Sequence, residues 1–169
     1  MSIVLDGTAG VTTPGLSSTS NATVTGTLGV TGLITATTAG ISVPTASAAG
    51  TVYSSTYTPT LTGVTNVDGT TAFSCRYWRL GSQVMVSGRM NLDTTAGAPT
   101  STGVRISLPI ASNFATAATD CSGTGATDTS VVEAWGILAD TVNDEAQLSG
   151  VSYVTINRAV YFNFTYTII

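Results

Sequence analysis

Two side chains that carry much of enzyme chemistry are missing, because the 169-residue sequence contains no histidine and no lysine. Without histidine there is no Ser-His or Cys-His pair, and without lysine there is no Schiff base or Ser-Lys dyad. Structural zinc would need four cysteines, or cysteines together with histidines, and the chain has two cysteines. We therefore expect no enzyme of these classes, no catalytic residue, no metal site and no cofactor.

The two cysteines, Cys75 and Cys121, are too few for a disulfide framework. Cys75 lies in an apolar segment, which predicts a buried free thiol. A bridge between the two stays open at this point.

Charge is also scarce, with 8% charged residues against about 25% in typical soluble domains. The net charge is -4, which argues against a nucleic-acid partner, because such binding needs a basic stripe. No apolar run approaches the roughly 18 residues of a membrane span, so we expect no membrane insertion. The start of the chain lacks the basic region and apolar core of a signal peptide, which predicts synthesis in the cytoplasm.

A short repeat occupies residues 24–35, with the sequence Val-Thr-Gly-Thr-Leu-Gly followed by Val-Thr-Gly-Leu-Ile-Thr. A period of two predicts an extended strand with one apolar edge. Such a strand cannot bury that edge alone, so we expect residues 1–50 to form an extended docking segment that contacts other chains. A flexible Gly/Thr linker is the alternative. The contact candidates are Val24, Leu28, Val30 and Ile34.

Residues 51–169 show the pattern of an all-β domain. Short alternating segments separated by turn residues, with no helical period, predict a β-sandwich or jelly roll of about seven or eight strands. We expect the longest loop at residues 111–130 and a strand buried on both faces near 131–138. The other expected strands cover residues 73–80, 83–92, 104–108, 151–156 and 160–168.

The segments 73–80 and 83–92 are predicted to pair across a turn at Gly81 and Ser82. This pairing divides their side chains between two faces. One is a core face, with Phe73, Cys75, Tyr77, Val84, Val86 and Met90. The other face mixes Arg76, Trp78, Met85 and Arg89, a composition typical of subunit contacts. Ordinary packing under a loop is the alternative for this second face.

The acidic residues outside the core pattern are weak candidates for recognition by loops: Asp120, Asp128, Asp140, Asp144 and Glu145. Oxygen ligands in the 140–145 turn could hold calcium, but the spacing is not that of an EF-hand. Two carboxylates can also hydrolyse glycosides, which leaves a carbohydrate-active enzyme as a remote alternative. A solvated turn is the interpretation we favour.

One further pair of residues raises the question of sugar binding. Glu133 and Trp135 are two positions apart and therefore share one face of a strand. They could form a sugar platform, or equally a core tryptophan beside an acid at the edge of the sheet.

Several stretches resemble proteins of tailed-bacteriophage virions. Residues 5–15, Leu-Asp-Gly-Thr-Ala-Gly-Val-Thr-Thr-Pro-Gly, resemble the openings of such proteins, and the repeat at 24–35 resembles shaft segments of trimeric phage fibres. Residues 57–62, 75–88 and 107–114 together resemble a β-domain at the C-terminal end of phage fibre-like and virion-surface proteins.

The resemblance implies a homotrimer on the virion exterior, with the N-terminal region docked and the C-terminal domain facing outward. It brings no catalytic residue with it. We expect a cement protein that decorates and stabilises the capsid, with the major capsid protein as its partner. The alternative is a short tail fibre or host-adhesion protein, which would contact a tail component and a host surface glycan.

Overall fold

The computed structural model describes residues 52–129 and 133–169. The expected docking and trimerisation segment, residues 1–50, lies outside the described residues together with Val24, Leu28, Val30 and Ile34. The described residues form ten strands and one four-residue helix, which confirms the expectation of an all-β fold. The elements are β1 (Val52–Tyr57), β2 (Leu61–Thr65), β3 (Gly69–Ala72), β4 (Cys75–Leu80), β5 (Gln83–Asp93), β6 (Thr100–Ile106), α1 (Ala117–Asp120), β7 (Cys121–Thr127), β8 (Ala134–Asp140), β9 (Glu145–Ser152) and β10 (Arg158–Thr167).

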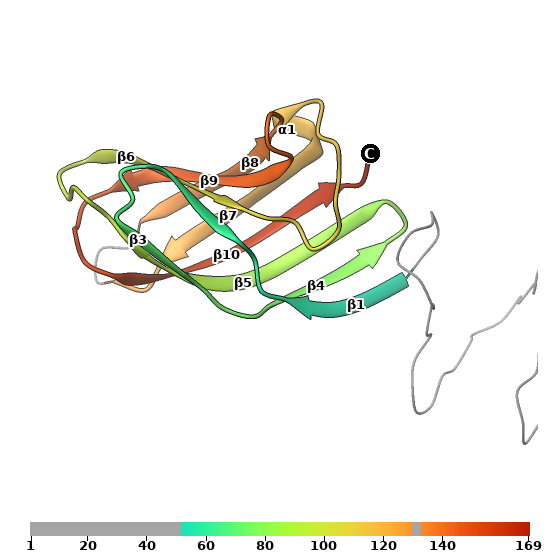
Figure 1. The fold of residues 1–169 in the computed structure, drawn as a ribbon, viewed down its shortest axis with the longest axis horizontal. Helices are drawn as coiled ribbons and strands as arrows, with labels where there is room; N and C mark the ends of the chain where they lie inside the picture. Colours follow the sequence, from blue (N-terminus) through green and yellow to red (C-terminus); the bar gives the residue numbers. More distant parts are fainter. Residues whose placement is uncertain (1–51, 130–132) are drawn as a thin grey trace, which may run out of the picture. The chain divides into compact units, whose positions relative to one another are not determined.

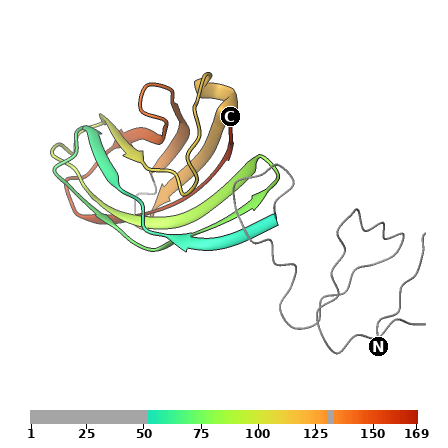
Figure 2. The same cartoon turned by 45° about the vertical axis from the view of Figure 1, so that its right-hand side comes forward.

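All strand pairs are antiparallel and belong to one sheet, in the order β1-β4-β5-β10-β7-β8-β9-β6-β2. The remaining strand, β3, pairs with the end of β5 that lies beyond its contact with β4. Strands β2 and β3 follow each other in the chain, but β2 pairs with β6 and β3 pairs with β5. This connection brings the two flanks of the sheet together, so the sheet curls into a half-barrel (Figures 1 and 2).

The single sheet differs from the β-sandwich or jelly roll that the sequence suggested. Strand β10 is the reason, because it pairs along ten residues with β5 and along seven residues with β7. It therefore joins two groups of strands that a sandwich would keep in separate sheets. Alternation of apolar residues shows which face of a strand is buried, but not which strands are neighbours.

The core lies on the inner face of the curl. Burial alternates along β4, where Cys75, Tyr77 and Arg79 are buried and the residues between them are exposed. The predicted hairpin is confirmed, with Gly81 at φ 61° in the turn between β4 and β5. Five of the six residues of its predicted core face are buried: Cys75, Tyr77, Val84, Val86 and Met90. The prediction was wrong for Phe73, which is half-buried and lies against the guanidinium of Arg89, because it precedes β4 and does not follow the alternation of that strand. The largest fully buried side chains include Tyr166, Phe164, Met90, Leu92, Ile106, Ile137 and Leu148.

The connection from β6 to α1, residues 107–116, is tied to the core by two tyrosines. The Tyr166 hydroxyl donates to the Ile110 carbonyl at 2.7 Å and accepts from the Ile110 amide at 3.1 Å. The Tyr57 hydroxyl donates to the Ser107 carbonyl at 3.2 Å. The Phe114 ring packs edge-to-face against the Tyr166 ring, with centroids 5.9 Å apart. A long connection is thereby held in one conformation against the sheet.

Within the expected loop 111–130, residues 117–120 form α1 and residues 121–127 form β7. The loop prediction was wrong there, because the sequence Cys-Ser-Gly-Thr-Gly-Ala-Thr has little apolar character and two glycines. The glycines are needed for packing: a Cβ at Gly123 would lie 2.5 Å from the Cβ of Phe164 on β10. Strand β7 therefore has few apolar side chains because its neighbours, such as Phe164, already fill the space that such side chains would occupy. Across the described ranges, no helix is long and apolar enough to span a bilayer.

Two further strand predictions were wrong in detail. The strand expected near 131–138 is β8, and its burial alternates, with Leu138 50% exposed. It is therefore covered on one face and not on both. The strand expected at 151–156 is β9, which begins at Glu145 and ends at Ser152. Its alternating Ala, Gln, Leu and Ser residues resemble a polar connection in the sequence alone.

Candidate interaction surfaces

Three of the four subunit-contact candidates on the described strands lie together on the outer face of the sheet. Trp78 on β4 pairs directly with Met85 on β5, and Arg76 lies two residues before Trp78. The three side chains line one hollow, which also includes Asn163 and Thr165 of β10. Trp78 is 49% exposed and Met85 is 39% exposed.

Two more apolar side chains extend this cluster to the edge of the sheet. Val52 on β1 pairs with Leu80 on β4, and they are 44% and 58% exposed. We call Val52, Trp78, Leu80 and Met85 the edge patch. Its composition of aromatic, Met and aliphatic side chains with an arginine beside them is typical of interface centres. Val52 is the first residue of β1, so residues 1–51 precede it in the chain.

Arg89, the fourth candidate, shares the outer face but contacts a different residue. Its guanidinium lies over the Phe73 ring, 4.1 Å from the centroid. Arg89 is half-buried and pairs with Tyr161 on β10, four residues along β5 from Met85. The cation–π contact gives Arg89 a structural role within its own domain.

Two acidic candidates meet at the turn between β8 and β9. Asp140 and Glu145 are paired across this turn, and both approach Arg105 of β6, at 3.6 Å and 3.4 Å. Burial raises the pKa of Asp140, but hydrogen bonds from Asn143 and Val142 and the charge of Arg105 outweigh it, so the pKa is lowered overall. The Asp140 carboxylate therefore organises the turn in its ionised form, and both carboxylates lie beside Arg105.

Two of the other three acidic candidates are also held by local contacts. The Asp144 carboxylate accepts the amide of Phe114 at 2.7 Å. Asp120 accepts the amides of Ala115 and Thr116, and the hydrogen bond from Thr116 is the main reason that its pKa is lowered. Asp128 is exposed. In the part of the chain that the structure describes, no three acidic or cysteine side chains are grouped to hold a metal ion.

The sequence did not reveal the buried ion pair between Glu133 and Arg158. These side chains meet at 2.8 Å, and each is 1% exposed. Arg158 also donates to the hydroxyls of Thr94 and Ser152. Trp135, which is 3% exposed, packs near the guanidinium at 6.0 Å. Trp135 is therefore a core residue and cannot serve as a platform for sugars. In the sequence, the pair could be noticed only as a carboxylate and an arginine at the ends of two apolar segments. Nothing in the sequence indicates that these two residues pair with each other.

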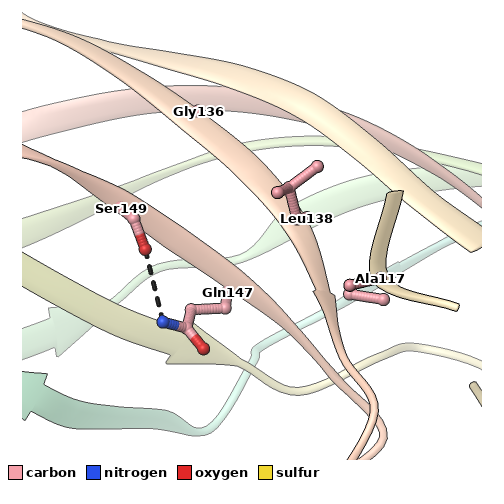
Figure 3. A pocket seen from close by; sticks show the side chains of 6 residues that line it. Ala117, Gly136, Leu138, Gln147 and Ser149 are labelled. Carbon is pink, nitrogen blue, oxygen red and sulfur yellow. Dashed lines mark hydrogen bonds between the residues drawn. The ribbon is translucent and has the colours of Figure 1, made fainter. Parts of the chain in front are cut away.

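The outer face also has two shallow hollows. The first, of about 370 Å³, is lined by Gly136 and Leu138 of β8, Gln147 and Ser149 of β9, and Ala117 of α1. Figure 3 shows Leu138 and Ala117 on one side of it, with Gln147 donating to Ser149 at 3.3 Å on the other.

The second hollow, of about 460 Å³, lies over β5, β10 and β7. Its exposed side chains are those of Ser87, Thr124, Ala126, Tyr161 and Asn163. Tyr161 is 50% exposed, so its ring forms one wall of the hollow.

The thiols offer no nucleophile. Cys75 and Cys121 are both free and buried, so the bridge between them is not formed. Burial raises the pKa of Cys121 to about 12 and also raises that of Cys75. Both side chains are therefore protonated and unreactive at neutral pH.

Comparison of the chain with protein-family models, with curated proteins and with solved structures finds no match.

Proposed function

We propose that this chain is a non-enzymatic structural protein of the exterior of a bacteriophage virion. It acts as a short homotrimer that decorates the capsid and stabilises it by bridging capsid subunits. Its partners are copies of itself and the major capsid protein. The homotrimer and the virion come from the resemblance of the N-terminal and C-terminal segments to phage proteins.

The edge patch is the observation that carries this proposal. Val52, Trp78, Leu80 and Met85 expose apolar surface on neighbouring strands at one edge of the sheet. Covering such a patch stabilises a complex by roughly 25 cal/mol per Å² of apolar surface. The sequence of the repeat at residues 24–35 predicts a second apolar edge in the segment before this domain. The exposed edge patch and this predicted edge both support a role in assembly.

The chemistry of the described acids supports a non-enzymatic role. A glycosidase needs two carboxyl groups on either side of a bound sugar, one of them with a raised pKa. Asp120 and Asp140 have lowered pKa values, and Asp140 and Glu145 are turned toward Arg105. These carboxylates hold turns and an ion pair together.

The test compares the wild-type chain with Trp78→Ser, using Val142→Ser as the control. Val142 is 87% exposed in the turn between β8 and β9, far along the chain from the edge patch. We expect wild type and control to sediment as trimers and to raise the heat resistance of particles that lack the protein. Trp78→Ser should reduce both effects while keeping the fold. A wild-type chain that sediments as a stable monomer and adds nothing to particles would overturn the proposal.

Labelling the protein on intact particles distinguishes the proposed cement function from the alternative function. Copies on the head agree with a cement protein, whereas copies restricted to the tail indicate a short fibre or host-adhesion protein. In the second case, particles without the protein should keep their heat resistance and lose adsorption to host cells.

A further inference from the structure

The two hollows on the outer face lie along one row of paired residues. Strand register places Ser87 of β5 opposite Asn163 of β10, and Asn163 opposite Thr124 of β7. Thr124 is opposite Gly136 of β8, and Gly136 is opposite Ser149 of β9. This row crosses five neighbouring strands and runs from one hollow to the other. We call it the outer channel. With strands about 4.8 Å apart, the row is about 19 Å long.

The outer channel is lined by uncharged groups along its length. None of the residues that line either hollow is Asp, Glu or Arg. The side chains of Ser87, Thr124 and Asn163 are exposed, and no hydrogen bond joins them to another described residue. Hydroxyl and amide groups of this kind both donate and accept. A neutral ligand that itself carries donors and acceptors matches them without needing a counter-charge.

Apolar side chains stand beside the polar row at two places. The Tyr161 ring flanks Asn163 in the second hollow, and Leu138 flanks Gly136 in the first. Each is 50% exposed. An exposed aromatic ring offers a flat apolar face with a polar tip. A sugar ring has an apolar face of C–H groups and a rim of hydroxyls. The Tyr161 ring and Leu138 match the apolar face, and the polar row matches the hydroxyls.

We propose that the outer channel binds a neutral oligosaccharide that lies across the strands from β5 to β9. The row of Ser87, Asn163 and Thr124 makes hydrogen bonds to sugar hydroxyls, and Tyr161 packs against a ring face. The proposal does not rest on the position of the protein in a virion, because the described domain contains every residue involved.

Other ligand classes fit the outer channel less well. A nucleic acid or another polyanion would need several cations along the row, and the lining residues have none, with the single Arg76 opposite Ser87 at one end. An extended peptide adds to the free edge of a sheet, whereas this row crosses the middle of one. A globular partner would favour the larger apolar side chains of the edge patch.

Gly136 makes a sharp test possible because it keeps the middle of the channel open. A Cβ built at this position meets nothing within 4 Å, so a larger residue projects into open space without disturbing the fold. Gly69 on β3 is a matched control, because its Cβ would meet only the Cβ of Asp93, at an ordinary 3.8 Å. It lies outside the outer channel.

The experiment titrates the full-length isotope-labelled chain with neutral hexasaccharides of glucose, mannose and N-acetylglucosamine, and follows backbone amide signals by NMR. We expect at least one of these probes to shift the signals of Thr124, Gly136 and Asn163. Gly136→Gln and Tyr161→Ala should each weaken this binding by about tenfold or more, equivalent to about 1.4 kcal/mol. Gly69→Gln should bind as the wild type does.

Three results would overturn the proposal. The first is that none of the probes moves the channel signals at millimolar concentration. The second is equal binding by Gly136→Gln and Gly69→Gln, which would place the sugar elsewhere. The third is movement of the same signals when only the protein concentration is raised, which would make the channel a contact between copies. The spectra themselves report whether each variant is folded.

Discussion

The guanidinium of Arg158, the first residue of β10, and the carboxylate of Glu133, the residue before β8, form a buried ion pair at 2.8 Å. The second Glu133 oxygen accepts the Tyr153 amide at 2.7 Å. Arg158 reaches two hydroxyls and the carbonyls of Val154 and Ile156. One charged pair therefore links three connections of the half-barrel: the residues after β5, the residue before β8 and the residues between β9 and β10.

Breaking this pair from one side should be costly. Glu133→Gln leaves the Arg158 charge buried without its counter-ion, and we expect the free energy of unfolding to fall by about 3–5 kcal/mol. Urea denaturation measures the change. Glu145→Gln is the control, since the Glu145 contact with Arg105 is partly exposed and should contribute less than about 1 kcal/mol.

A double replacement separates charge from packing at the same place. Glu133→Leu combined with Arg158→Met removes both charges, and we expect it to regain most of the stability that Glu133→Gln loses. A loss near zero for Glu133→Gln alone would mean that water reaches the pair and that its burial does not matter.

Two glycines on neighbouring strands should respond in opposite ways to alanine. Gly123→Ala places a Cβ 2.5 Å from the Cβ of Phe164, and we expect it to lower stability by about 1–3 kcal/mol or more. Gly136→Ala adds a methyl group in open space and should be neutral or slightly stabilising, because alanine restricts the unfolded chain. Thermal unfolding of both variants under one condition tests the pair, and similar losses in both would contradict the packing argument.

The tether between Tyr166 and Ile110 should hold the 107–116 connection in place. Tyr166→Phe removes a hydroxyl that both donates to the Ile110 carbonyl and accepts from its amide. We expect a loss of about 1–3 kcal/mol and faster hydrogen exchange at the Ile110 amide. Tyr161→Phe, on the exposed outer face, is the matched control and should change neither quantity. Unchanged exchange at Ile110 in Tyr166→Phe would show that the connection is held by Phe114 packing alone.

Stability should fall in alkaline solution because of a buried thiol. Burial raises the pKa of Cys121 from 9.0 to about 12, so the folded chain keeps this proton at pH values where the unfolded chain loses it. The contribution is fully present below pH about 9 and is lost as the pH rises toward about 12. The buried Tyr57 and Tyr166 hydroxyls, whose pKa values are also raised, add to the same trend.

Urea midpoints measured across this alkaline range test the effect. Cys121→Ala should show a shallower decline than wild type, because one of the titrating groups is gone. An identical decline in the two proteins would mean that the tyrosines and Cys75 account for the whole pH dependence.

Part of the candidate site was predictable from local pattern. The sequence 73–92 alternates across a two-residue turn, and this alone placed Arg76, Trp78 and Met85 on one face of a hairpin. The partner of Arg89 was not predictable, because Phe73 precedes β4 and its direction depends on the path between β3 and β4. The outer channel could not be found in the sequence, since it consists of residues from five strands that only register brings into line.

Local alternation, turn residues and the absence of histidine and lysine were enough to determine an all-β domain without the common catalytic pairs. These features act over a few residues, because side chains alternate between the two faces of a strand and the alternation alone shows which face is buried. The tertiary structure alone decided that β10 joins all strands into one curled sheet, that glycine-rich residues 121–127 lie in its middle, and that Glu133 meets Arg158. Those outcomes depend on which distant segments pack together, and the size of a neighbour such as Phe164 cannot be inferred from the residues beside Gly123.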